Sequence, residues 1–202
     1  MTHTLIRNGR TRRCVGVVAA LTLAGLSGIA SAVAGPATVE HVEWVDSVYY
    51  EAGEGEDCSL DFDVLWTVHE VGTIVTQEKG PDGLWHWSGR FQGTQSWANP
   101  VTGDVFTNRY ALNDRDFRVA DNGDGTLTIQ VQVAGPNHYS LNGSRLFTDT
   151  GMIRFSLLVD HNGTPSDPTD DGEAEFVGLD KLTGLRQTDG RDFCADLEEF
   201  IG

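Results

Sequence analysis

The sequence of this 202-residue chain predicts an all-β protein, a single-domain antiparallel β-barrel or β-sandwich of roughly seven to nine strands with a short C-terminal helix. Apolar and polar residues alternate with a period of two over several long runs, which is typical of strands with one buried and one solvated face. Clusters of glycine, proline, asparagine and aspartate separate these runs, so neighbouring strands are expected to pair antiparallel. Only the last segment of the chain has helical periodicity.

The first segment has the features of a secretory signal peptide, over residues 1–34. Four arginines precede an apolar run from Cys14 to about Ala30, and the small residues Ala32-Val33-Ala34 follow it. A cationic start, a short apolar middle and an Ala-x-Ala exit are the three parts of such a peptide. We expect cleavage after Ala34, with Ala32 as the alternative, and a protein that is secreted or held at the cell surface. The run is interrupted by glycines and falls short of the about 20 apolar residues that a membrane helix needs, so no stable membrane span is expected in the mature chain.

Residues 35–202 are therefore expected to form a single acidic β domain. All 30 acidic residues lie in this part, whereas four of the 14 basic residues lie before it, so its net charge is 10 − 30 = −20. A surface of this sign repels phosphate groups, which excludes nucleic acid as a partner. Most of the acids are interpreted as a solvated surface that keeps the protein soluble. The partners that the sequence leaves open are a small molecule or a surface polymer.

Cys58 and Cys194 are predicted to form a disulfide. Cys14 lies inside the signal peptide and leaves with it, which leaves an even pair in an oxidising compartment. The bridge would tie the start of the β domain to its last element. For a loop of this length the chain-entropy model gives on the order of 5 kcal/mol, and real bridges contribute roughly 2–4 kcal/mol.

Seven runs have the strand pattern, in chain order 39–50, 64–74, 85–97, 106–112, 127–133, 153–159 and 176–178. The clearest is 85–97, in which Trp85, Trp87 and Trp97 share one side with Phe91, while the other side is polar. Packing in a core explains this pattern, and a platform for stacking sugar rings is the alternative. Trp44 lies in a less regular run and is expected to be the more exposed ring.

Turn sequences separate the runs at 80–83, 99–103, 121–125 and 160–163. The end of the chain predicts a helix capped by Asp192. Its apolar residues recur with helical spacing at Phe193, Leu197, Phe200 and Ile201. The residues expected to face solvent are Asp196, Glu198 and Glu199. Cys194 would pin this helix onto the sheet, because a helix this short does not persist alone.

Taken together, these motifs resemble those of small exported actinobacterial β-proteins that carry one disulfide and have no established activity. The shared motifs are Cys58 before the first long strand, the Asn-Pro-x-Thr-Gly turn at 99–103, the Gly135-Pro136 turn feature and the Asp-x-Cys-x-x-Leu ending at 192–197. The resemblance spans most of residues 35–202 and implies an antiparallel barrel or sandwich with one disulfide. It implies no activity. In this chain the turn is followed by Asp104 where relatives often carry a base, and the acidic loop at 162–172 is longer.

The loop after Asp160 is the one candidate metal site. Five acids lie within residues 160–173, and Asp167, Asp170 and Asp171 are the candidate calcium ligands, because calcium prefers carboxylate and carbonyl oxygens. The density of glycine, proline, serine and threonine favours the alternative, a solvated loop. No other cofactor is predicted.

No catalytic motif is found in the mature chain. It has no Gly-x-Ser-x-Gly elbow, and His69-Glu70 lacks the second histidine of a zinc protease helix. The sequence therefore favours a non-enzymatic, exported binding or surface module. Two alternatives stay open, namely a secreted hydrolase that acts through two carboxylates and a carbohydrate-binding module. A pair of carboxyl groups about 5–10 Å apart would favour the hydrolase.

Overall fold

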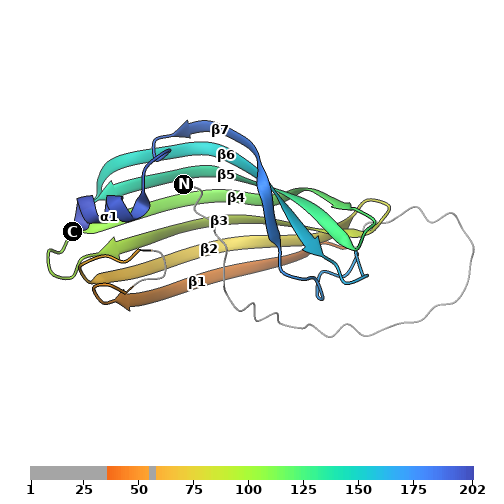
Figure 1. Cartoon of the computed structure of the whole chain (residues 1–202), viewed down its shortest axis with the longest axis horizontal. Helices are drawn as coiled ribbons and strands as arrows, with labels where there is room; N and C mark the ends of the chain where they lie inside the picture. The colour runs from red at the N-terminus through yellow and green to blue at the C-terminus, as the bar shows by residue number, and fades with distance from the viewer. Residues whose placement is uncertain (1–35, 55–57) are drawn as a thin grey trace, which may run out of the picture.

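The computed structural model describes residues 36–54 and 58–202, so the predicted signal peptide lies outside the described residues. Seven antiparallel strands form one sheet in chain order, and one short helix follows them (Figure 1). The elements are β1 Thr38–Tyr50, β2 Val64–Lys79, β3 Leu84–Ala98, β4 Val105–Asp121, β5 Thr126–Leu141, β6 Ser144–Asp160, β7 Glu175–Arg186 and α1 Phe193–Ile201. The prediction of an antiparallel all-β fold with a C-terminal helix is confirmed.

The sheet is open. Figure 1 shows it arched along its length, with β1 and β7 as its two edges. A barrel needs these edges to meet and a sandwich needs a second sheet, and the part of the chain that the structure describes shows neither closure. Within residues 36–54 and 58–202, no helix has both the length and the apolar character that crossing a membrane requires.

Side-chain alternation gives the sheet one mainly apolar face, called the apolar face, and one mainly polar face. The apolar face also carries polar side chains near the middle of the strands, namely Glu70, Gln95, Asn108, Asn137 and Asp149. In the β2–β3–β4 ladders Trp97 pairs with Trp66 on one side and with Phe106 on the other, which identifies the apolar face. This face comprises the positions in phase with Trp97, among them Val68, Trp87, Phe91, Tyr110, Leu112, Val131, Val133, Ile153, Phe155 and Leu182. The opposite, polar face carries Thr67, Arg90, Gln92, Thr94, Thr107, Arg115, Gln130 and Gln132.

Helix α1 covers one end of the apolar face. The buried residues there are Leu60, Val64, Phe106, Leu197 and Ile201. Phe200 stacks on Phe106 with ring centroids 5.8 Å apart, and Phe193 meets Trp97 edge-on at 4.9 Å. The apolar stripe predicted for the helix is therefore the surface that packs on the sheet, and this packing stabilises a helix of only nine residues.

Two links hold α1 in place, and a cap stabilises its first turn. The predicted disulfide is present, with the Cα atoms of Cys58 and Cys194 5.4 Å apart. The Asp192 carboxylate caps the helix by accepting the backbone N–H groups of Cys194 and of the next residue. At the other end, Asn99 Nδ2 donates to the Ile201 carbonyl oxygen at 2.7 Å. The predicted turn at 99–103 is therefore also a support for the helix.

One prediction about the helix is wrong, because Asp196 is buried, with 6% of its surface exposed. Arg191, which precedes the helix, donates from Nε to Asp196 Oδ1 at 2.9 Å. The same guanidinium lies 4.3 Å from the centroid of the Phe147 ring. A charge-assisted hydrogen bond and an aromatic contact together compensate the burial of the carboxylate.

The prediction of a turn feature at Gly135-Pro136 is also wrong, since both residues lie inside β5. The β4–β5 ladder lacks pairs between Tyr110–Asn137 and Asn113–Ala134, and the register is the same on both sides of this gap. Proline has no N–H group for a ladder bond, which accounts for the gap. The strand continues through a local break in the ladder and does not reverse.

Candidate functional site

Strand β4 places two acids on the apolar face. Phe106, Tyr110 and Leu112 set the phase of this strand, and Asp114 and Asp116 follow at alternate positions on the same side. Neither acid was among the candidate site residues that the sequence analysis named. The predicted strand ended at Leu112. Extending its alternation by two and four residues would have placed both acids on the apolar face.

The cross-strand neighbours of Asp114 are apolar. It lies opposite Gly89 of β3 and Val133 of β5. Trp87 and Phe91 flank Gly89 on the same face, and their rings stack with centroids 6.0 Å apart. A Cβ atom on residue 89 would overlap the Phe91 ring, so glycine is what lets this ring lie flat on the strand. Asp114 therefore lies beside a stacked aromatic pair.

Asp116 has a structural bond that Asp114 lacks. The β3–β4 ladder ends at the Ser88–Arg115 pair, and the β4–β5 register shifts just after Asp116, as at a β-bulge. Beyond the last ladder pair, Asp116 Oδ2 accepts the backbone N–H of Trp87 at 2.7 Å. The Asp116 side chain thus replaces a missing main-chain partner.

Burial raises the pKa of both carboxyl groups to about 6. For Asp114 the next cause is the negative charge of Asp116. For Asp116, the Trp87 N–H and the positive charge of Lys79 act in the opposite direction and lower the pKa. Asp114 Oδ1 is buried and has no hydrogen-bond partner among the described residues. A buried carboxylate oxygen without a partner is costly to ionise.

We expect Asp114→Asn to stabilise the protein at neutral and alkaline pH. The pKa of Asp114 rises from 3.8 to about 6 on folding, so between these values the folded protein binds more protons than the unfolded chain. Stability therefore falls as the pH rises from about 4 to about 7, and the wild-type carboxylate gives no penalty below that window. At about pH 8 the variant should be more stable by about 1–3 kcal/mol.

Urea unfolding of both proteins across this pH range measures the difference. Asp82→Asn, in the exposed turn between β2 and β3, is the matched control and should keep the wild-type pH profile. A pH profile of Asp114→Asn that runs parallel to the wild-type profile would contradict the prediction.

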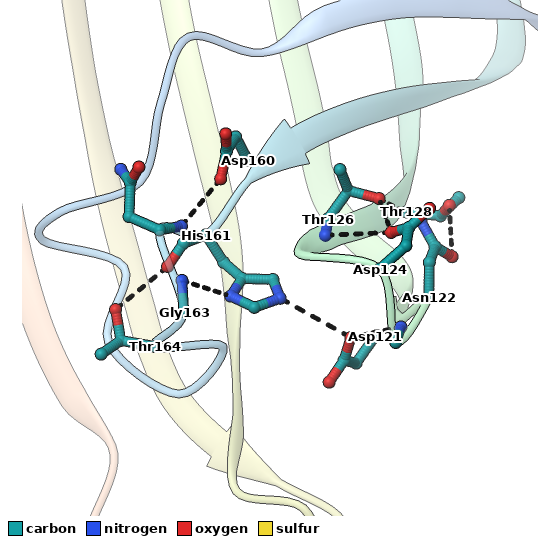
Figure 2. A network of polar contacts seen from close by, with 11 residues as sticks. Asp121, Asn122, Asp124, Thr126, Thr128, Asp160, His161, Gly163 and Thr164 are labelled. Carbon is teal, nitrogen blue, oxygen red and sulfur yellow. Dashed lines mark hydrogen bonds and ion pairs between the residues drawn. The ribbon is translucent and has the colours of Figure 1, made fainter.

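The acidic loop after β6 begins at a buried histidine. His161 is 5% exposed, and its Nδ1 accepts the backbone N–H of Gly163 at 3.2 Å (Figure 2). Its Nε2 lies 3.7 Å from Asp121 Oδ1, at the end of β4. The His161 backbone N–H donates to the Gly125 carbonyl oxygen at 3.1 Å. These contacts join the predicted turns at 121–125 and 160–163 to each other.

The three candidate calcium ligands lie in this loop. Asp167 accepts the hydroxyl of Thr169 at 2.6 Å, and Asp170 accepts the hydroxyl of Thr164 at 2.7 Å. Across the described residues, which include Asp171, no group of three or more histidine, cysteine or acidic side chains is arranged to hold a metal ion. Calcium binding by this loop stays a prediction.

The polar face carries an open groove of about 730 Å³ over β1 to β4. The polar side chains that line it are His41, Glu43, Thr73, Arg90, Gln92 and Asn113. The tryptophans lie elsewhere. Trp97 packs under α1, Trp87 stacks on Phe91, and Trp44, on the edge strand β1, is 37% exposed, as predicted. The groove therefore has no tryptophan on which a sugar ring would stack.

No family model, no curated protein and no solved structure matches this chain. The resemblance to small exported actinobacterial β-proteins therefore stays a prediction from motifs.

Proposed function

We propose that the protein is an exported, non-enzymatic binding module, which holds a small molecule with an apolar body against the uncovered part of the apolar face. Helix α1 packs on one end of this face, and no other helix or sheet of the described residues covers the rest. On β7, Phe176, Leu179 and Leu182 are 48%, 49% and 39% exposed. Partly exposed apolar side chains on one face are typical of ligand sites.

The observation that supports this proposal best is the pair of carboxyl groups within the apolar surface. Ligand sites combine an apolar lining with a few polar groups that fix the orientation of the ligand. Asp114 and Asp116 are such groups, and their pKa values, raised by burial to about 6, are typical of functional positions. Of the two, Asp114 has a buried carboxylate oxygen without a hydrogen-bond partner among the described residues.

Hydrolysis through two carboxylates is the second candidate. Residues two apart on a strand have Cα atoms about 6.6–6.8 Å apart, which suits a carboxylate pair that acts on a glycosidic bond. Such an enzyme needs one acid and one base, whose pKa values the site pushes apart. Here burial moves both pKa values in the same direction to about 6, and Asp116 is engaged by the Trp87 N–H. These observations favour binding over hydrolysis.

A matched pair of β7 variants tests the proposed function. Leu182 lies opposite Ile153 on the apolar face, and Leu185 lies opposite Thr150 on the other face. Both are exposed, so glutamate at either position is compatible with folding. We expect the neutral dye Nile red to bind the wild-type protein saturably, with increased fluorescence. Leu182→Glu should weaken binding by roughly tenfold or more, because a charge is placed on the apolar surface, and Leu185→Glu should not.

Native mass spectrometry of the protein purified from its own culture medium gives an independent measurement. A retained small molecule would support the proposal. Equal dye binding by the two glutamate variants, or no saturable binding by the wild-type protein, would overturn it.

A further inference from the structure

We propose that the ligand of the apolar face is an amphipathic amine, whose positively charged nitrogen is held by Asp114 beside Trp87 and Phe91. This inference rests on the proposed function and adds the chemical class of the ligand. It follows from the side chains around Asp114, from the aromatic pair and from the charge of the whole chain.

One carboxylate oxygen of Asp114 has no hydrogen-bond donor, and a cationic ligand would supply one. Its Oδ1 atom is buried and receives no hydrogen bond from the described residues. None of the ion pairs found among those residues involves it. The nearby Asp116 is already bonded to the Trp87 N–H, and Lys79 acts electrostatically on Asp116. An ammonium group donates up to three hydrogen bonds. Because Asp114 Oδ1 is buried, the side chains over it must shift before a ligand nitrogen can reach it, and the bond then formed would be charge-assisted.

The aromatic pair favours the same kind of ligand. Trp87 and Phe91 stack on the apolar face at the position of Gly89, directly opposite Asp114. The faces of aromatic rings attract cations, and indole attracts them most strongly. A nitrogen placed at Asp114 would therefore meet a carboxylate and aromatic rings together, and its alkyl or aryl body would lie on the neighbouring apolar residues.

The net charge of the chain disfavours an anionic ligand. The predicted mature chain carries 10 basic and 30 acidic residues, a net charge of 10 − 30 = −20. A field of this sign raises the local concentration of cations and lowers that of anions. Ionised Asp114 and Asp116 would also repel a carboxylate placed on the apolar face, so a fatty acid is disfavoured.

Three probes with the same eight-carbon chain test the inference, namely octylamine, octanol and octanoate. Their affinities are measured by isothermal titration calorimetry at about pH 8, where both acids are ionised. We expect octylamine to bind the wild-type protein roughly tenfold tighter than octanol, and octanoate to bind more weakly than octanol. Asp114→Asn should bring the ratio of amine to alcohol affinity close to one. Asp82→Asn removes the same charge from an exposed turn and should keep the wild-type ratio.

The outcomes separate this inference from the proposed function. Octanol binding with no preference for octylamine would overturn the cation assignment and leave the proposed function standing. A preference that Asp82→Asn reduces as much as Asp114→Asn does would show general attraction to an acidic protein, and would also overturn the assignment. If none of the three probes binds, the proposed function itself fails.

Discussion

Replacing both bridge cysteines by alanine, Cys58→Ala with Cys194→Ala, should lower the free energy of unfolding by about 2–5 kcal/mol. For a domain of this size the corresponding fall in Tm is roughly 5–20 °C. The bridge joins residues 136 apart in sequence and anchors a nine-residue helix whose packing forms the main core cluster. Without it the unfolded chain is less constrained, and α1 is held by packing and hydrogen bonds alone.

Thermal unfolding followed by circular dichroism measures the effect. Reduction of the wild-type protein should reproduce the alanine variant, because both remove the same covalent bond. Ile201→Ala separates the bridge from the packing of the helix, since it truncates a fully buried side chain of α1 and leaves the disulfide intact. A double variant with the wild-type Tm, or oxidised wild-type protein that reacts with a thiol label at both cysteines, would refute the prediction.

Gly135→Ala should destabilise the protein by about 3 kcal/mol or more. The φ angle of Gly135 is 148°, a conformation that L-residues rarely adopt. A Cβ atom there would overlap the carbonyl oxygen of Ala111 on β4, and a backbone atom has no flexible end that can move aside. Either β4 and β5 separate further or β5 changes its path.

Gly178→Ala on β7 is the matched control. A Cβ atom at residue 178 would meet nothing within 4 Å, so its effect should stay within about 0.5 kcal/mol. Urea denaturation of the two variants gives both values. Equal midpoints for the two alanine variants would show that the close approach at Gly135 is not needed by the fold.

The strands and turns were predictable because their chemistry is local. A period of two needs only neighbouring residues, and the turns at 80–83, 99–103 and 121–125 each lie between two strands of the structure. The same holds for α1, whose cap and apolar spacing lie within ten residues, and for the single cysteine pair. Strand β1, which has a less regular pattern, was also confirmed.

The middle of the sheet was harder to predict because local signals conflict there. Gly135-Pro136 is a common turn pair, yet it lies inside a 16-residue strand. The prediction therefore ended the fifth strand at residue 133 and began the sixth at 153, whereas β5 and β6 continue to a tight turn at Asn142-Gly143. Pairing of β5 with both neighbouring strands overrides the local preference for a turn. This pairing cannot be predicted from the residue types alone.

The candidate site was missed for a similar reason. From residue 113 to 116 every side chain of β4 is polar, so alternation no longer distinguishes the two faces. The predicted strand ended at residue 112, and the register with Gly89 and Val133 shows that it continues in the same phase, which puts Asp114 on the apolar side. Asp196 was misplaced because the arginine that pairs with it precedes the helix, outside the helical pattern.

The order of the strands has a consequence for biosynthesis. Each strand pairs with the one that precedes it in the chain, so the sheet can be assembled progressively from its N-terminal strand. Helix α1 is the exception, since it is translated last and packs against the middle strand β4. A product terminated before Phe193 would contain all seven strands, but its Phe106 and Trp97 rings would stay bare. Such truncated chains should aggregate, so complete translation is a condition for solubility.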